Sequence, residues 1–294
     1  THRPMAGRAG RKPYRRPRPD PRDARPDQNR PGPARIGNRG VGVNHLSPEI
    51  ATKYGVLIGN TPGVLHESCA DFTFGLILDV TRRISHADRC VREGAWDRHD
   101  QTPYLGSDVH NKALGLVGMG SIAQAVAKRA TGFNMIVNYF SRTRKPSLES
   151  KLGLIWKSDL TSLIRESDII SLHVPLTEET QHLIADAELG HMKPTAFLIN
   201  ISRGSVVDST ALYKALVSKG IAGAAIDVSD PEPMPLDDPL MKLENMVITP
   251  HIASGSVATA TAMGLMAAKN IITAIKGEQM PSCVNPNASV KYQE

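Results

Sequence analysis

The sequence has few of the features that mark membrane, disulfide-stabilised or metal-binding proteins. Only 4% of its 294 residues are aromatic, and no run approaches the roughly 18 consecutive apolar residues that a membrane-spanning helix needs. The three cysteines, Cys69, Cys90 and Cys283, have no spacing typical of a metal site or a disulfide framework. We therefore predict no metal, no membrane partner and reduced thiols, which indicates a cytoplasmic protein.

The excess of positive charge lies at one end of the chain. Residues 1–40 contain twelve of the 35 Lys and Arg residues and only three acids, Asp20, Asp23 and Asp27, so their net charge is +9. The other 254 residues carry a net charge of −3, which gives no attraction for phosphate backbones, and we predict no nucleic-acid partner. A basic arm for RNA stays a minor alternative, because the segment lacks interleaved aromatic residues.

The same segment is rich in proline. Residues 1–40 contain eight of the 21 prolines and few apolar side chains. They cannot bury enough surface to offset the entropy lost on ordering, so we predict a disordered N-terminal tail. Transit peptides are also Arg-rich, but they are amphipathic, Ser-rich and poor in acids, unlike this segment.

From Val41 onward, short β-branched runs alternate with helical patterns, which is typical of βαβ units. The runs "ALGLV", "SDIISLHVP", "TAFLINIS", "GAAIDV" and "NMVITPH" predict the strands of a doubly wound parallel sheet, a Rossmann-type α/β fold. Residues 67–94 have apolar side chains at helical spacing and end at Gly94, so we predict one long helix there. A last helix is predicted near 259–278.

A glycine-rich turn follows the predicted strand "ALGLV" and opens a predicted helix. Its residues are Gly118, Met119, Gly120, Ser121, Ile122 and Ala123. In this context a G-x-G-x-x-G/A pattern indicates a dinucleotide site, because the glycines let the backbone approach a pyrophosphate that the helix N–H groups bind. A glycine turn without a ligand is the alternative, which the flanking strand and helix disfavour.

The acid that NAD-dependent enzymes place after the second strand of this unit is missing. The chain has "NYFSRTRK" there, and Ser141, Arg142 and Arg144 offer a hydroxyl and two guanidinium groups. Guanidinium groups suit a 2′-phosphate, and no carboxylate is present to repel one. We predict NADPH as cofactor, with NADH possible; a solvated basic loop would leave the missing acid unexplained.

Three charged or titratable residues follow three of the predicted strands. Arg203 comes after "FLIN", Glu232 after "GAAIDV" and His251 after "NMVITP". Carboxyl ends of parallel strands meet at one edge, where ligands bind. There a guanidinium can hold a carboxylate, and a histidine beside an acid can supply the proton that a carbonyl oxygen needs when hydride arrives. Taken singly, Arg203 would more often be a surface ion pair, Glu232 a turn residue, and His251 a helix cap or a buried histidine with its hydrogen bonds satisfied.

Longer motifs extend this pattern over most of the chain from Val41 onward. They are "NTPGVLHESCADFTFGLILDVTRRI", "LVGMGSIAQAVAKR", "HVPLTEETQHLI", "MKPTAFLINISRGSVVD" and "AAIDVSDPEPMPLDDPLMKLENMVITPHIAS". Together they resemble the D-isomer-specific 2-hydroxyacid dehydrogenase family, and more closely its glyoxylate/hydroxypyruvate reductase and 2-ketogluconate reductase branch.

The resemblance implies roles for particular residues. Arg203, Glu232 and His251 would be the catalytic residues, and the backbone at Val41 and Gly42 would meet the substrate carboxylate. Asp227 would contact the nicotinamide amide, and Val174 and Pro175 would border the adenine site. The implied cofactor contacts are Gly118, Gly120, Ser121, Ile122, Ser141, Arg142, Val174, Pro175, Thr180, Ile201, Asp227 and His251. The resemblance also implies a homodimer.

The chain departs from the family at its N-terminus. Members begin with a flavodoxin-like substrate domain, of which this chain keeps only the last part, and the Arg/Pro-rich tail lies where its first strands should be. We expect a truncated gene model, read in a wrong frame before about Gly40, rather than a lineage-specific extension. The predicted units are a tail at 1–40, a substrate-domain remnant at 41–85, a dinucleotide-binding domain at 86–265 and a return to the substrate domain at 266–294.

The sequence thus predicts an NADPH-dependent reductase of a small 2-oxoacid, glyoxylate, hydroxypyruvate or 2-ketogluconate. Two alternatives stay open. The first is a catalytically silent fragment that still binds dinucleotide, because the missing strands belong to the domain that closes over substrate. The second is a dinucleotide-sensing protein similar to corepressors of the same fold.

Overall fold

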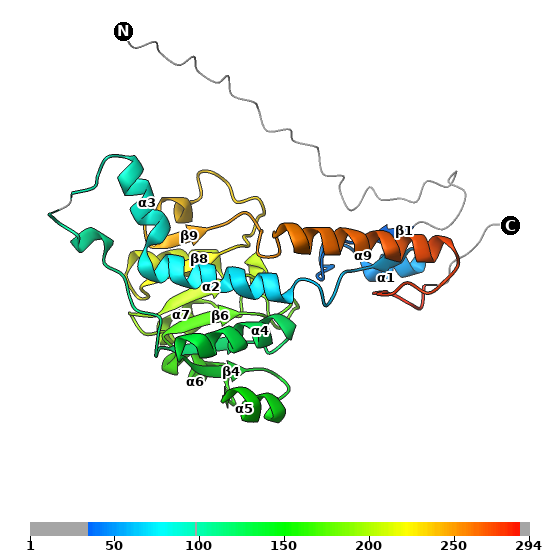
Figure 1. The fold of residues 1–294 in the computed structure, drawn as a ribbon, viewed down its shortest axis with the longest axis horizontal. Coiled ribbons are helices and arrows are strands. Elements are labelled where there is room, and N and C mark those ends of the chain that lie inside the picture. Colours follow the sequence, from blue (N-terminus) through cyan, green and yellow to red (C-terminus); the bar gives the residue numbers. More distant parts are fainter. Residues whose placement is uncertain (1–34, 98, 289–294) are drawn as a thin grey trace, which may run out of the picture.

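The chain folds around a seven-stranded parallel sheet with a smaller two-stranded unit beside it (Figure 1). The computed structural model describes residues 35–97 and 99–288. The strands are β1 (Arg35–Gly37), β2 (Leu57–Gly59), β3 (Ala113–Val117), β4 (Ile136–Phe140), β5 (Ile155–Trp156), β6 (Ile169–Leu172), β7 (Phe197–Asn200), β8 (Gly223–Ile226) and β9 (Met246–Ile248). The α-helices are α1 (Pro48–Lys53), α2 (His66–Arg82), α3 (Ile84–Arg92), α4 (Ser121–Ala130), α5 (Pro146–Leu152), α6 (Leu160–Glu166), α7 (Asp186–His191), α8 (Ser209–Val217) and α9 (Val257–Ile275).

The strand order of the large sheet is β5-β4-β3-β6-β7-β8-β9. The chain moves outward from β3 to β4 and β5, and then returns to the other side of β3 with β6. The order therefore reverses between β3 and β6, and doubly wound folds bind ligands at the carboxyl ends of strands beside such a point. The predicted doubly wound α/β fold is confirmed.

Alternate residues of the strands enter two separate hydrophobic cores, because successive side chains point to opposite faces of a sheet. On one face Leu114, Leu116 and Ile199 pack with side chains from α2 and α4. On the other face Val117 and Leu198 pack with side chains from α6, α7 and α8. Helices thus cover both faces, which fixes the positions of the strand ends.

The smaller unit is built from β1, β2, α1 and α9, with the C-terminal segment across it (Figure 1). A Cβ atom on Gly59 would lie 2.7 Å from the Asn270 side chain, so α9 approaches this strand closely. Asn285 Oδ1 accepts a hydrogen bond from the Ile58 N–H at 2.8 Å, and Asn285 Nδ2 donates to the Val56 carbonyl at 2.8 Å. The C-terminal segment is therefore tied to β2 by a buried amide.

The predicted tail of 1–40 is too long at its C-terminal end. Arg35–Gly37 form β1, which pairs in parallel with β2. Residues 1–34, to which the rest of that prediction applies, lie outside the described residues. Composition does not predict this strand, because its extended conformation depends on pairing with Leu57–Gly59 and not on its own three residues.

The single helix predicted over 67–94 is also wrong, since it is two helices. Arg83 adopts a left-handed φ of 57° between α2 and α3. The Asp79 carboxylate accepts hydrogen bonds from the Ser85 hydroxyl and, at 2.7 Å, from the Ser85 backbone N–H, which satisfies a donor at the start of α3. Apolar spacing continues across the break, so periodicity alone did not reveal it.

Helix α9 is the one helix among the described residues that is long and apolar enough to cross a membrane, by length and composition only. In the most apolar stretch of 18 residues within α9, 28% is buried. Its buried side chains include Met263, Ala267 and Ala274, and the helix packs on β1 and β2. Contact with the small sheet therefore accounts for part of its apolar character.

The predicted division of the chain into units stays a prediction, and two packing relationships bear on it. Helix α2 packs against α4 and against strands of the large sheet. Helix α9 runs without a break through residues 265 and 266, where a boundary was predicted, and packs on the small sheet. We propose that α2 belongs to the dinucleotide-binding unit and α9 to the small unit.

Candidate active site

Three of the predicted site residues lie just beyond the carboxyl ends of neighbouring strands. Arg203 follows β7, Glu232 follows β8 and His251 follows β9, and these strands are adjacent in the sheet. His251 Nδ1 lies 2.7 Å from Glu232 Oε1, so the two side chains are hydrogen-bonded. Because Nδ1 is bonded to the carboxylate, Nε2 is the nitrogen that remains for a ligand.

A buried carboxylate holds the loop that carries His251. Asp227 is 1% exposed, and it accepts hydrogen bonds from Thr249 Oγ1 at 2.6 Å, from the Ile252 N–H at 2.9 Å and from the Ala253 N–H at 2.7 Å. His251 itself has a φ of 56°, an uncommon conformation for a residue with a Cβ. The surrounding hydrogen bonds maintain that conformation, which aims the imidazole. A nicotinamide contact for Asp227 stays a prediction.

The Arg203 guanidinium is held at two of its three nitrogens. Its Nη1 donates to the Ser202 carbonyl at 2.6 Å, and its Nε donates to Asn44 Oδ1 at 3.3 Å. Its Nη2 makes no hydrogen bond to a described residue. Burial lowers the pKa of Arg203, and the negative charge of Glu232 opposes that shift. The group is a partly desolvated cation whose Nη2 has no hydrogen-bond partner among the described residues, which suits a carboxylate ligand.

The backbone at Gly42 lies directly against this guanidinium. A Cβ atom on Gly42 would be 1.6 Å from Arg203 Nη2, so any other residue would displace the guanidinium. The neighbouring loop is fixed from the small unit, because Asn60 Nδ2 donates to the Val41 carbonyl at 3.0 Å and Asn38 Nδ2 donates to the Gly42 carbonyl at 3.1 Å. The two predicted substrate-binding positions therefore lie beside Arg203.

The turn after β7 is shaped by a buried amide. Asn200 Oδ1 accepts from the Ser202 N–H at 2.9 Å and from the Ser202 hydroxyl at 2.8 Å, while its Nδ2 donates to the Arg203 carbonyl at 2.9 Å. A Cβ atom on Gly204 would lie 2.1 Å from the carbonyl carbon of Ser229. The turn is thus pressed against the segment that leads from β8 to Glu232.

The glycine-rich turn has the space that a pyrophosphate needs. Gly118 has a φ of 93°, and a Cβ atom there would lie 2.6 Å from the His173 carbonyl oxygen. Around the Cβ position of Gly120, by contrast, no atom of the described residues lies within 4 Å. Gly120 is the N-cap of α4, whose first residues are Ser121 and Ile122. The start of α4 therefore has open space beside Gly120, and a helix N-terminus with room beside it fits the pyrophosphate of a dinucleotide.

Only one of the two arginines after β4 is available to a ligand. Arg144 Nη2 and Nε bond the Glu149 carboxylate at 2.8 and 2.9 Å, and the guanidinium lies over the Trp156 ring at 5.4 Å. Arg142 is exposed and makes no hydrogen bond or ion pair to a described residue, and Ser141 Oγ donates to the backbone of the same loop at 2.6 Å. Arg142 is the candidate for a 2′-phosphate.

The loop after β6 borders the same edge. Thr180 Oγ1 donates to the Pro175 carbonyl at 2.6 Å, which closes the turn that follows Val174. Burial lowers the pKa of His173 to about 3, so its imidazole is neutral, with Nε2 2.9 Å from Ser171 Oγ. The remaining predicted cofactor contacts also follow carboxyl strand ends: Val174 and Pro175 after β6, Ile201 after β7 and Asp227 after β8.

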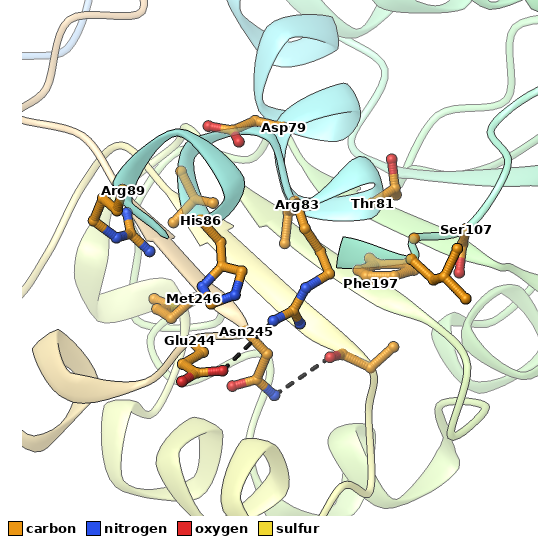
Figure 2. Close-up of a pocket in the computed structure, with 15 residues that line it drawn as sticks. Asp79, Thr81, Arg83, His86, Arg89, Ser107, Phe197, Glu244, Asn245 and Met246 are labelled. Atoms are coloured by element: carbon orange, nitrogen blue, oxygen red, sulfur yellow. Dashed lines mark hydrogen bonds and ion pairs between the residues drawn. The ribbon is translucent and has the colours of Figure 1, made fainter. Parts of the chain in front are cut away.

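A cavity of about 230 Å³ lies at the opposite edge of the sheet, between the α2–α3 break and the amino ends of β7, β8 and β9 (Figure 2). Arg83 Nη2 is 3.5 Å from the Glu244 carboxylate there, and Asn245 Nδ2 donates to the Ala222 carbonyl at 3.3 Å. Phe197, the first residue of β7, lines it, whereas Arg203 follows the other end of that strand. Among the described residues no cluster of three or more His, Cys, Asp or Glu could hold a metal ion.

Sequence reasoning did not identify Asn44. It lies two residues after Gly42, and its Oδ1 reaches Arg203 while its Nδ2 donates to the Leu176 carbonyl at 3.1 Å. Its proximity to the predicted substrate-binding positions was the only signal in the sequence, since the contacts join segments more than 130 positions apart.

Comparisons with known proteins agree with this arrangement. Residues 74–253 match the family model for the D-isomer specific 2-hydroxyacid dehydrogenase, NAD binding domain. A glyoxylate reductase of Korarchaeum cryptofilum is 48% identical over 267 residues, which are 90% of this chain and 80% of that protein. A glyoxylate reductase of Thermococcus litoralis is 47% identical over 262 residues, which are 88% of this chain and 78% of that protein.

Solved structures show the same likeness. The NADPH-dependent glyoxylate/hydroxypyruvate reductase of Sinorhizobium meliloti, in complex with NADP and malonate, is 30% identical with a TM-score of 0.80. The match covers 89% of this chain and 80% of that chain. The TT0316 protein of Thermus thermophilus is 43% identical with a TM-score of 0.80, and the match covers 85% of this chain and 78% of that chain.

The fold, the glycine-rich turn and the similar proteins all indicate the same class: the protein is an oxidoreductase that uses a nicotinamide dinucleotide. Within that class, the chain belongs to the D-isomer specific 2-hydroxyacid dehydrogenase family, in its glyoxylate reductase branch. Its substrate is a small 2-oxoacid, which it reduces to the 2-hydroxyacid.

Proposed function

We propose that this enzyme uses NADPH to reduce glyoxylate, hydroxypyruvate or 2-ketogluconate to the D-2-hydroxyacid. The observation that carries the proposal is the hydrogen-bonded pair of His251 and Glu232 at the strand ends next to Arg203. Relatives that are glyoxylate reductases support the substrate class. The exposed Arg142, where an acid would favour NADH, supports NADPH, although NADH could also bind. The same relatives favour an enzyme over a silent fragment or a corepressor-like sensor.

The dinucleotide would lie along the carboxyl edge of the sheet. Gly118, Gly120 and the N–H groups at Ser121 and Ile122 would hold its pyrophosphate, because that helix start faces open space. Further contacts are proposed for Ser141 and Arg142 at the 2′-phosphate, Val174, Pro175 and Thr180 near the adenine, and Ile201 and Asp227 toward the nicotinamide. When bound, the cofactor supplies the hydride that reaches C2 of the oxoacid.

The substrate carboxylate would bind between Arg203 and the backbone at Val41 and Gly42. Arg203 Nη2 has an open donor at this place, and a partly buried guanidinium bonds a carboxylate more strongly than an exposed one does. The carboxylate would be fixed on one side, which leaves the keto carbon facing the cofactor and the keto oxygen facing His251.

The proton would come from His251 Nε2. As hydride adds to C2, the C=O π bond opens and its oxygen takes that proton, so the product is a neutral hydroxyl group. Glu232 would hold the imidazole through Nδ1 and stabilise its protonated form by charge. The chain thus needs no further acid for the reaction.

We also propose that the enzyme is a cytoplasmic homodimer. Support comes from exposed apolar side chains on α3 and on the segment after it, a part of the chain that extends beyond the end of α2 in Figure 1. They are Ile84, Val91, Trp96 and Leu105, exposed by 49–69%. Exposed apolar groups of this kind favour association. Light scattering on the purified protein measures the mass directly, and a monomer would contradict the proposal.

Steady-state kinetics test the function. The wild-type chain should oxidise NADPH in the presence of at least one of the three oxoacids. His251→Ala should lower kcat by about 10²–10⁴-fold and change the Kd for NADPH only slightly, while the exposed His110→Ala is the matched control. A wild-type chain that binds NADPH but turns over none of the oxoacids would instead support the silent fragment.

A further inference from the structure

One amide side chain joins three segments that meet at the active-site edge. Asn44 lies between β1 and α1 in the small unit. Its Oδ1 accepts a hydrogen bond from Arg203 Nε at 3.3 Å, and its Nδ2 donates to the Leu176 carbonyl at 3.1 Å. Arg203 follows β7, and Leu176 follows β6. Asn44 therefore links the small unit to two loops of the large sheet.

The loop that carries Asn44 is braced from within. Asn38 Nδ2 donates to the Gly40 carbonyl at 3.0 Å and to the Gly42 carbonyl at 3.1 Å. Asn38 Oδ1 lies 3.1 Å from His45 Nε2, on the far side of Asn44. These contacts hold the backbone on both sides of Asn44, so its amide group meets Arg203 from a fixed position.

The contact with Nε determines which donors of Arg203 remain for a ligand. With Nη1 bonded to the Ser202 carbonyl and Nε bonded to Asn44, two nitrogens of a planar group are fixed, and the plane is fixed with them. Nη2 is then left beside the backbone of Gly42. Because the amide oxygen of Asn44 is neutral, it orients the guanidinium without cancelling its charge.

We propose that Asn44 is a positioning residue for the substrate carboxylate: it orients Arg203 and ties the substrate-binding loop to the dinucleotide-binding unit. This proposal rests on the proposed function, since it assigns Arg203 to the carboxylate. Asn44 is exposed, so replacing it removes little buried surface and should leave the fold intact. Its effect should therefore fall on the affinity for the carboxylate and spare the affinity for the cofactor.

Binding of oxalate, a dicarboxylate close to glyoxylate in size, tests the proposal without turnover. Calorimetry on the protein saturated with NADPH should show an oxalate Kd about 3- to 10-fold higher for Asn44→Ala than for wild type, the effect of one lost orienting hydrogen bond. The Kd for NADPH and the Tm should not change. Asn287→Ala, an exposed asparagine far along the chain, is the matched control and should bind oxalate as wild type does.

Asn44→Asp tests the need for a neutral acceptor. Aspartate can accept from Arg203 Nε but cannot donate to the Leu176 carbonyl, and its negative charge pairs with the guanidinium and repels the dicarboxylate, so its oxalate Kd should be at least as high as that of Asn44→Ala. An unchanged oxalate Kd in Asn44→Ala overturns the proposal, and so does a Kd for NADPH that rises, or a Tm that falls, along with the loss of oxalate binding. Wild-type protein that binds oxalate but reduces no 2-oxoacid would contradict the proposed function and leave the role of Asn44 standing; wild-type protein that does not bind oxalate overturns both.

Discussion

His251 and Glu232 are 19 positions apart and follow different strands, yet His251 Nδ1 and Glu232 Oε1 are 2.7 Å apart. Both side chains are partly exposed, at 45% and 37%, so a ligand can reach the pair. The contact forms because β8 and β9 are parallel neighbours in the sheet and therefore end at the same edge.

Glu232→Gln should separate the charge of this pair from its geometry. Glutamine can still bond Nδ1, but it no longer stabilises the protonated imidazole by charge. The kcat for the oxoacid should therefore fall, while the Kd for NADPH should stay close to that of wild type. Steady-state kinetics and a cofactor titration check this, and a kcat equal to that of wild type would mean that Glu232 only orients the ring.

Arg142→Ala should weaken NADPH selectively. One charge-assisted hydrogen bond is worth about 1.5–3 kcal/mol, so the KM for NADPH should rise roughly 10- to 150-fold with little change for NADH. Arg144→Ala is the control, because that guanidinium is already bonded to Glu149 and lies over Trp156. Equal losses with both cofactors would show that Arg142 does not bind the 2′-phosphate.

Cys69 should be inert in the folded protein. Burial, and secondly the charge of Asp227, raise the pKa of its thiol to about 12, so almost no thiolate exists near pH 8. A thiol reagent at pH 8 should label no more than Cys90 and Cys283 in the native protein, and all three cysteines in denaturant. Peptide mapping that finds Cys69 labelled in the native protein would contradict this.

Asp168→Asn should destabilise the fold in a pH-dependent way. Burial raises the pKa of Asp168, but bonds from Lys193 Nζ at 2.7 Å and the Ala113 N–H at 2.9 Å outweigh burial, and the pKa is lowered. A lowered pKa contributes stability above the unfolded value of about 3.9 that is lost as the pH falls through the folded value.

At pH 7 the variant should therefore be less stable by about 1–3 kcal/mol, and this gap should close as the pH falls below about 4. Urea denaturation across that range measures it. Asp186→Asn is the control, since Asp186 is 72% exposed and 3.9 Å from Lys214. A gap that does not depend on pH would mean that packing, and not charge, decides the effect.

The sequence was sufficient to predict the residues that local patterns place at strand ends. Arg203, Glu232 and His251 follow buried runs whose carboxyl ends must converge in a parallel sheet, so their shared edge could be predicted before any coordinates. The glycine turn at Gly118 and Gly120 was predictable for the same reason. These predictions needed only the order of strands and helices.

Features set by long-range contacts could not be predicted. Asn44 reaches Arg203 across 159 positions, and β1 exists through its pairing with β2. The helix break at Arg83 is stabilised by the hydrogen bond from Ser85 to Asp79, and the spacing of apolar residues does not predict that bond. Each of these features depends on a contact with a particular side chain or strand, and the local sequence pattern does not predict which one.

Helix α9 connects the two halves of the candidate active site. Its N-cap, Ser256, comes five residues after His251, and Ser256 Oγ accepts from the Thr259 N–H at 3.2 Å. The helix spans about 28 Å, and its other end packs on the sheet that carries the loop of Gly42. The segment that carries His251 and the sheet that carries the Gly42 loop are therefore joined by one unbroken helix, whose length sets the span between the two halves of the site.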